Sequence, residues 1–310
     1  MNIAVPKDLL LSIIKGPLEK ALIIKGGFGS ANILEQGKGV LDDTTKLVVY
    51  SKKNKRVAFV LSSFTKYGSL PTRNFTTSHS IKVKLGEKLG SVILDPIIYG
   101  ESKGVEYVVW PYCEPLKTNR FLRKIQLIYL KPALLGWLLG MTVKSRKSLD
   151  KREVLESFIK PLKRLKGKNI SERVKQEINW QLEKLEKKDW QPFFVIAHND
   201  LWCDNFLISN QPVTKANGFR KLVIIDWAGA NEKGFAMYDL VRLSMSLGVS
   251  RAEFTKQVRK HCKVLDCDLR NSLGYLLASF ACLSENLEEF PEERFIALLH
   301  KSFDYLDARL

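Results

Sequence analysis

The sequence is poor in cysteine, and its cysteines do not fall into a metal-binding pattern. Only five occur among 310 residues, an odd number, and none belongs to a Cys-x-x-Cys pair. Cys262 and Cys267 are near each other, but no second ligand pair follows them. We therefore expect neither a structural zinc site nor a disulfide framework, and we predict a reduced, cytoplasmic protein.

Long apolar runs are also scarce. The run over residues 9–14 ends at Lys15 and is too short for the core of a secretory signal. The longest run, residues 127–143, contains Lys131 and Pro132 and has roughly 17 residues, the lower limit for a membrane-spanning helix. We expect a buried or interfacial helix there rather than a membrane span.

Acidic residues are fewer than basic ones. The chain has 33 Asp and Glu and 50 Lys and Arg, which give a net charge of +17. This excess favours anionic partners, such as nucleotide phosphates, acidic lipid headgroups or an acidic substrate. Much of it lies in residues 144–168, which we interpret as a solvated basic helix, with peripheral contact to an acidic membrane surface as the alternative. Nucleic acid is not expected as a partner, because this segment lacks interleaved aromatic residues.

The chain does have enough apolar residues, 45%, to form two compact units with their own cores. The first third is rich in strand-like runs, and from about residue 116 onward the apolar spacing is mostly helical. Strands are expected at residues 21–25, 31–35, 46–50, 56–61, 105–110, 193–197 and 222–226. Helices are expected at residues 78–89, 117–130, 151–165 and 171–187, and from 237 to the end.

This order of elements predicts an α+β protein with two lobes. The small β-rich N-lobe covers residues 1–113, and the larger helical C-lobe covers residues 114–310. We expect a hinge near residues 111–115 and a small-molecule site in a cleft between the lobes.

Three residues of the predicted C-lobe have the types and the spacing that phosphoryl transfer requires. Asp200 follows an apolar run, Asn205 comes five residues later, and Asp226 ends another apolar run 21 residues after Asn205. One carboxylate can orient a hydroxyl nucleophile, while the amide oxygen and the second carboxylate can hold the magnesium that neutralises the phosphates. Taken singly, each aspartate could instead be a turn residue at the end of a strand.

A family resemblance rests on three motifs that occur in order. They are His198-x-Asp200-x-x-x-x-Asn205, Ile225-Asp226-Trp227 and Gly234-Phe235-Ala236-Met237-Tyr238-Asp239-Leu240. Together they resemble the aminoglycoside phosphotransferase and choline kinase family. Its members have a protein-kinase-like fold and phosphorylate hydroxyl groups of small molecules with ATP and magnesium. The resemblance is specific over residues 190–245 and architectural elsewhere.

The resemblance implies a role for each matching residue. Asp200 would be the catalytic base or would orient the nucleophile, and Asn205 and Asp226 would ligate Mg²⁺. Asp239 would be structural and would tie the start of its helix back to the catalytic loop. His198 is expected to brace that loop rather than to do chemistry.

The N-lobe offers weaker candidates for nucleotide binding. A glycine-rich segment resembles a kinase phosphate-binding loop between two strands, although glycine-rich hairpin turns are common. Residues 101–112 occupy the place of the kinase hinge, where Trp110 and Tyr112 could flank the adenine or pack between the lobes. The expected phosphate-contacting residues are Gly26, Gly27, Gly29 and Ser30.

The N-lobe also departs from the family. The strand at residues 56–63 has no lysine for the phosphates, and the helix that should offer a glutamate partner has no acid before Glu87. Lys46, Lys52 or Lys66 could supply the missing positive charge. The alternative is a pseudokinase, which would bind a nucleotide or a partner protein without turnover.

The leading hypothesis is an ATP-dependent phosphotransferase that moves the γ-phosphate to a hydroxyl of a small molecule. A sugar, a glycan and a lipid-linked acceptor are all compatible with the basic surface. The expected cofactors are ATP and Mg²⁺. A third hypothesis is a basic peripheral protein that docks on acidic lipid through residues 127–168.

Overall fold

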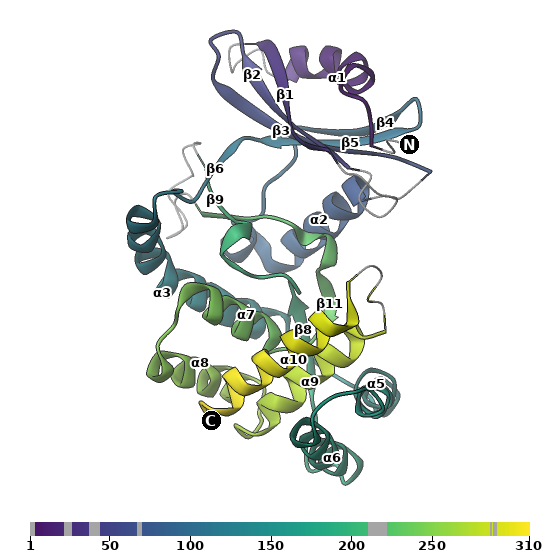
Figure 1. Ribbon diagram of the computed structural model, residues 1–310, viewed down its shortest axis with the longest axis vertical. Helices are drawn as coiled ribbons and strands as arrows, with labels where there is room; N and C mark the ends of the chain where they lie inside the picture. The colour runs from purple at the N-terminus through teal and green to yellow at the C-terminus, as the bar shows by residue number, and fades with distance from the viewer. Residues whose placement is uncertain are drawn as a thin grey trace. The chain divides into compact units, whose positions relative to one another are not determined.

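The computed structural model describes residues 4–21, 27–36, 44–66, 70–209, 222–285, 287 and 290–310. The chain forms two compact units (Figure 1). The N-terminal unit consists of Met1–Leu116 and Asp204–Gly229, and the C-terminal unit consists of Lys117–Cys203 and Ala230–Leu310. The predicted domain boundary between residues 113 and 114 stays a prediction.

A five-stranded antiparallel sheet is the centre of the N-terminal unit, with the strand order β1-β2-β3-β5-β4. It confirms the strands expected near residues 31–35, 46–50, 56–61 and 105–110. The hairpin of β2 and β3 pairs Leu47 with Val60 and Val49 with Ala58, so these four side chains share one buried face, while Val48 and Phe59 lie on the other. The strands are β1 (Phe28–Gln36), β2 (Thr45–Ser51), β3 (Arg56–Phe64), β4 (Ile98–Ser102) and β5 (Val105–Pro111).

Helix α1 (Lys7–Ala21) covers one face of this sheet (Figure 1). Leu10, Ile14 and Leu18 recur every four residues and are fully buried against strand residues such as Val60. The strand expected at residues 21–25 is wrong at Ala21, which ends this helix; the other four residues lie outside the described part. The i, i+4, i+8 spacing was the signal for a helix, and the short apolar run at residues 9–14 obscured it.

A helix and a second, three-stranded sheet complete the N-terminal unit. Helix α2 (Leu70–Gly90) contains the predicted helix and has a kink at Gly86, where φ is 72°. A three-stranded sheet with the order β10-β9-β6 joins β6 (Cys113–Pro115), β9 (Phe206–Ser209) and β10 (Leu222–Ile224). The expected hinge segment therefore contains a strand, and β9 was not predicted.

The C-terminal unit is mainly helical. Its centre is α9 (Asn271–Leu283), in which every residue from Asn271 to Ala281 is buried. A helix without an exposed face is typical of the middle of a core. Helix α9 packs against the π-helix η2 (Leu155–Ile159), α5 (Lys160–Lys166), α6 (Glu172–Glu186), α7 (Tyr238–Leu247) and α10 (Glu292–Asp307). The other helices of the unit are α3 (Arg120–Ser145), α4 (Lys151–Val154) and α8 (Arg251–Val264). A small sheet of β11 (Asn231–Gly234), β8 (Phe193–Ala197) and β7 (Lys147–Ser148) completes the unit.

The apolar segment at residues 127–143 is part of α3. Asn119 caps this helix by accepting hydrogen bonds from the backbone N–H groups of Phe121 and Leu122, so the helix begins at Arg120. By length and composition α3 could cross a membrane, although about a third of its most apolar stretch is buried in the protein. It is the one such helix among the described residues.

Candidate functional site

The loop that carries Asp200 is shaped by a buried carboxylate. Strand β8 ends at Ala197, and the chain then turns through Asn199, whose φ is 66°. Asp239, in the first turn of α7, accepts hydrogen bonds from the backbone N–H groups of His198 (2.6 Å) and Asn199 (3.0 Å). Both oxygens of one carboxylate therefore fix the backbone just before Asp200, which confirms the structural role expected of Asp239.

Burial dominates the electrostatics of Asp239. It raises the pKa of the carboxyl to about 7, although the hydrogen bonds from His198 and Asn199 act in the opposite direction. His198 is fully buried, and its Nδ1 accepts a hydrogen bond of 3.3 Å from the backbone N–H of Asp200. His198 therefore braces the loop, as the sequence indicated.

Arg242 is a residue of this site that the sequence analysis missed. Its Nη2 lies 3.4 Å from Oδ1 of Asp200, whose side chain is 45% exposed, while that of Arg242 is 17% exposed. The guanidinium carbon also lies 4.7 Å from the ring centroid of Trp202, which is cation–π geometry. The sequence held one signal for Arg242, because it follows Asp239 by three residues on the same predicted helix. Residues at this spacing lie on one face of a helix, so Arg242 is close to the residue that holds the loop.

The predicted metal ligands lie at the end of a β ladder in the N-terminal unit. Strands β9 and β10 pair with Ile224 opposite Phe206, and the backbone N–H of Ile225 donates to the carbonyl of Asn205 at 3.0 Å. The register therefore places Asn205 and Asp226 on neighbouring ends of two paired strands. The backbone of Asp226 has φ 65°, a left-handed conformation that aspartate tolerates better than most residues.

Trp227 holds the turn after Asp226 in place. Its indole N–H donates to the carbonyl of Ile224 at 2.9 Å, and the side chain is buried. This confirms the expected core-packing role of Trp227. Asn205 is itself buried, within the short 3-10 helix Cys203–Asn205.

The three predicted residues are thus divided between the two units. Asp200 lies in the C-terminal unit, while Asn205 and Asp226 lie in the N-terminal unit. The ladder brings Asn205 and Asp226 together, and the arrangement of Asp200 around the same metal ion stays a prediction.

The glycine-rich segment follows α1 and runs into β1, which already contains Gly29 and Ser30. Gly27 has φ 69°, and Gly29 lies so close to β2 that a Cβ atom there would be 2.5 Å from the carbonyl oxygen of Ser51. The close approach of the strands is sufficient reason for glycine at position 29. Gly26 lies outside the described residues, and phosphate contact by Gly27, Gly29 and Ser30 stays a prediction.

The lysines that could replace the missing one differ in their surroundings. Lys46 forms an ion pair of 2.6 Å with Glu35 on the neighbouring strand. The side chain of Lys52 lies beside Gly27, with its Cε 3.5 Å from the place where a Cβ of Gly27 would be. Of the three candidates, Lys52 is the one that the structure places at the glycine-rich segment.

The expected adenine neighbours both have partners within the sheet. The ring of Trp110 lies 6.4 Å from that of Phe59. The hydroxyl of Tyr112 accepts a hydrogen bond of 2.8 Å from Arg56, which also lies 5.5 Å from the centre of its ring. Tyr112 therefore has a structural role at this end of the sheet, and adenine contact by either residue stays a prediction.

A β-rich N-terminal unit and a helical C-terminal unit with these loops are the architecture of the protein-kinase-like fold. The crystal structure named for a fructosamine-3-kinase of Haemophilus somnus 129PT has this fold, with a TM-score of 0.52 and 12% identity, over 93% of this chain and 96% of that chain. The sequence-based expectation of the fold class is therefore confirmed.

Two further crystal structures are similar at a lower level. A choline/ethanolamine kinase family protein of Mesorhizobium loti is 14% identical with a TM-score of 0.47, over 97% of this chain and 94% of that chain. A type VIII aminoglycoside-3'-phosphotransferase is also 14% identical, with a TM-score of 0.40, over 96% of this chain and 100% of that chain.

Residues 142–272 match the sequence model of the ecdysteroid kinase-like family. The match covers less than half of the chain but includes Asp200, Asn205, Asp226 and Asp239. No curated protein matches the chain by sequence. The chain is thus similar to kinase-like phosphotransferases in the segment that carries the predicted site.

Proposed function

We propose that this protein is an ATP- and magnesium-dependent phosphotransferase that phosphorylates a hydroxyl group of a small molecule. The observation that carries the proposal is the loop clamped by Asp239, which presents Asp200 at the end of a buried strand. Clamping of this kind fixes a reacting group in place, and phosphoryl transfer depends mainly on positioning and electrostatics.

The donor chemistry of Asn205 and Asp226 fits magnesium. An amide oxygen and a carboxylate are hard oxygen ligands, and Mg²⁺ in nucleotide sites is commonly held by one or two such side chains together with phosphate oxygens. When bound, ATP would supply the phosphoryl group, and the metal would neutralise the charge of the phosphates. Within the described residues there is no group of three or more His, Cys, Asp or Glu side chains that could hold a metal ion.

Three residues of the chain would act on the acceptor hydroxyl or position the group that does. Asp200 would accept the hydrogen bond of the acceptor hydroxyl and take up its proton as the hydroxyl attacks. Arg242 would hold the carboxylate of Asp200 in position, and Trp202 would support Arg242 from the other side.

The test is a screen of acceptors with the purified chain, ATP and Mg²⁺, read by mass spectrometry of the product. The panel contains sugars, lipid-linked glycans, aminoglycosides, choline and an ecdysteroid, the last because of the family that residues 142–272 match. Asp200→Asn and Asp226→Asn are expected to lower turnover by about 10³-fold or more, the scale of losing an essential transition-state contact.

Asp304→Asn is the matched control, because it makes the same chemical change on the exposed surface of α10. It should keep the wild-type rate. Unchanged turnover in Asp200→Asn or Asp226→Asn would refute the assignment of these residues.

The second candidate is a pseudokinase module that binds a nucleotide or a protein partner. The observation in its favour is that β3 contains no lysine and that the first acidic residue of α2 is Glu87. Binding of ATP without product formation from any acceptor would support this alternative.

A further inference from the structure

Helix α3 exposes an apolar face to solvent. Five of its large hydrophobic side chains are exposed, and Phe121 and Tyr129 are the most accessible at 70% and 79%. Because an α-helix turns by about 100° per residue, positions 121, 128, 129 and 143 lie on one side of it. The exposed side chains are Phe121, Leu122, Ile128, Tyr129 and Val143.

The opposite side of the same helix is attached to the protein. Arg123 donates to Sγ of Cys203 at 3.1 Å, and Lys131 donates to the carbonyl of Gly248 at 3.3 Å. In the second half of the helix, Leu134, Trp137 and Met141 are buried. The first half of α3 therefore departs from the usual surface helix, because its large apolar side chains point outward while Arg123 and Lys131 contact the protein.

The chain around this face is strongly basic. Residues 115–149 contain no Asp or Glu. They contain eight basic residues, Lys117, Arg120, Arg123, Lys124, Lys131, Lys144, Arg146 and Lys147. Of these, Arg120, Lys124 and Lys144 are exposed and form no ion pair with any residue that the structure describes.

Helix α8 lies beside α3 and adds more positive charge. Lys131 contacts Gly248, just before α8, and Arg146 donates to the carbonyl of Val264, at its end, so the two helices run alongside each other. The one acidic residue of α8 is Glu253. Five cations of α8 line a shallow depression of about 700 Å³, namely Arg251, Lys256, Arg259, Lys260 and Lys263.

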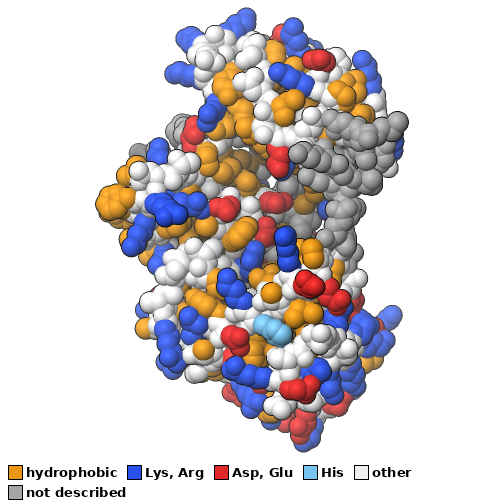
Figure 2. Space-filling model, viewed as in Figure 1, with side chains coloured by type: hydrophobic (Ala, Val, Ile, Leu, Met, Phe, Trp, Pro, Cys, Tyr) orange, Lys and Arg blue, Asp and Glu red, His pale blue; other side chains and the backbone are white. Residues whose placement is uncertain are grey.

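Figure 2 shows hydrophobic and basic side chains together over the start of α3, at the left edge of the view. From these observations we infer that the face formed by α3 and α8 docks on an anionic lipid surface. The apolar side chains enter the interfacial region of one leaflet, while the lysines and arginines contact acidic headgroups. Helix α3 lies along the membrane and does not cross it, because crossing would pull Leu134, Trp137 and Met141 out of the core of the unit.

Charge favours lipid over a second copy of this chain as the occupant. A symmetric dimer through α3 would bring together two segments that carry only positive charge, and this repulsion is strong in an interface from which water is excluded. An acidic headgroup layer supplies the opposite charge at any orientation of the helix.

The test is flotation of the full chain with vesicles of phosphatidylcholine, with and without phosphatidylserine. We expect binding only when phosphatidylserine is present, and we expect added salt to weaken it. Phe121→Ser together with Tyr129→Ser should lower the partition coefficient by about 10-fold or more, because both side chains are exposed and supply apolar contact area. Arg259→Gln together with Lys263→Gln should lower it by about 10-fold, the effect of removing two headgroup contacts.

The matched control is Ile33→Ser together with Leu34→Ser, which removes two exposed apolar side chains from β1 in the N-terminal unit. This variant should bind vesicles as the wild type does. A direct readout is Tyr129→Trp, whose added fluorescence should be quenched by brominated lipid in anionic vesicles.

The inference is overturned by equal binding to neutral and anionic vesicles, or by no binding at all. It is also overturned if the Phe121 and Tyr129 variant binds as the wild type does. Sedimentation that shows a dimer, dissociated by the same variant, would mean that a second copy covers the face. None of these outcomes depends on phosphotransferase activity, so the docking surface and the proposed reaction are tested independently.

Discussion

Asp239 shapes the loop that carries Asp200, although it does not enter the proposed chemistry. Its carboxylate accepts hydrogen bonds from two consecutive backbone N–H groups, and its burial raises its pKa to about 7. A buried carboxylate of this kind is stabilised by its hydrogen bonds against the cost of leaving water. The loop before Asp200 therefore has a defined backbone, on which the placement of the Asp200 side chain depends.

Arg242 is predicted to position Asp200. Arg242→Gln removes the positive charge beside Oδ1 of Asp200 and should lower kcat by about 10- to 100-fold, the scale of a small misplacement of a reacting group. The KM for ATP should change little, because the substitution leaves Asn205 and Asp226 unaltered. The measurement is steady-state ATP turnover, without an added acceptor until the screen identifies one.

Arg242→Lys is the matched variant, since it keeps the charge but loses the planar stack on Trp202. It should recover part of the lost rate. If Arg242→Gln turns over at the wild-type rate, or if lysine recovers nothing and both variants merely unfold at lower temperature, the positioning role is wrong.

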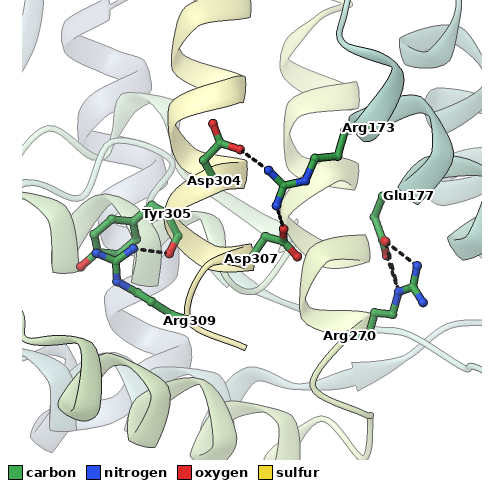
Figure 3. Close-up of polar contacts among 7 residues, drawn as sticks. All are labelled: Arg173, Glu177, Arg270, Asp304, Tyr305, Asp307 and Arg309. Atoms are coloured by element: carbon green, nitrogen blue, oxygen red, sulfur yellow. Dashed lines mark hydrogen bonds and ion pairs between the residues drawn. The ribbon is translucent and has the colours of Figure 1, made fainter.

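At the scale of elements, α6 connects to the later helices through two arginine–carboxylate contacts of different character (Figure 3). Arg270, just before α9, binds the nearly buried Glu177 of α6 through two nitrogens, at 2.9 and 3.1 Å. Gln181 donates to the same carboxylate at 2.8 Å. Arg173, also on α6, instead pairs with Asp304 and Asp307 of α10 at the exposed surface.

We predict that Glu177→Ala destabilises the protein far more than Arg173→Ala. Loss of Glu177 leaves the side-chain amide of Gln181 with the carbonyl of Arg270 in place of two acceptors. It also removes a forked, partly buried pair, and together these losses should cost about 1–3 kcal/mol. Arg173→Ala should cost less than about 1 kcal/mol, because exposed ion pairs are screened by water. Urea unfolding measures both losses of unfolding free energy, provided that the dependence of this free energy on urea concentration is the same in each variant. Equal losses in the two variants would contradict the prediction.

At the scale of the whole molecule, the predicted metal ligands and the predicted catalytic aspartate belong to different compact units. A nucleotide that binds the folded chain would stabilise it by mass action. This follows because the ligand binds the native chain and has no site on the unfolded one.

We therefore predict that ATP with Mg²⁺ raises the melting temperature and that chelation of the metal abolishes the rise. At about 100 times the dissociation constant, binding adds roughly 2.7 kcal/mol of stability. Asp226→Asn should lose most of the metal-dependent shift, while Asp304→Asn should keep it. A shift that does not depend on the metal would favour the pseudokinase alternative, and no shift would argue against nucleotide binding.

Local signals in the sequence were sufficient for most of the architecture. Apolar runs located β2, β3, β5 and β8, because consecutive residues of these strands are buried. Helical spacing located α2 and α6, which bury residues on one side. The order of Asp200, Asn205 and Asp226 is the basis of the predicted phosphoryl transfer, and their roles stay a prediction. The structural role of Asp239 also followed from the motif, and its hydrogen bonds to the backbone of His198 and Asn199 confirm it.

The sequence did not reveal features that depend on partners distant along the chain. Arg242 became a site residue only when folding brought α7 against the loop of Asp200. Its position three residues after Asp239 was a signal, but that spacing alone does not pair it with a residue 42 positions earlier. Strand β9 is short and forms because β6 and β10 pair on either side of it. The exposed apolar face of α3 could not be read from its composition, since the same apolar residues would suit a buried helix. Composition and spacing determine which side chains are apolar and which reactive groups the chain carries. Only tertiary packing decides that the apolar face of α3 is left exposed and that Arg242 meets Asp200, because both depend on contacts between residues distant along the chain.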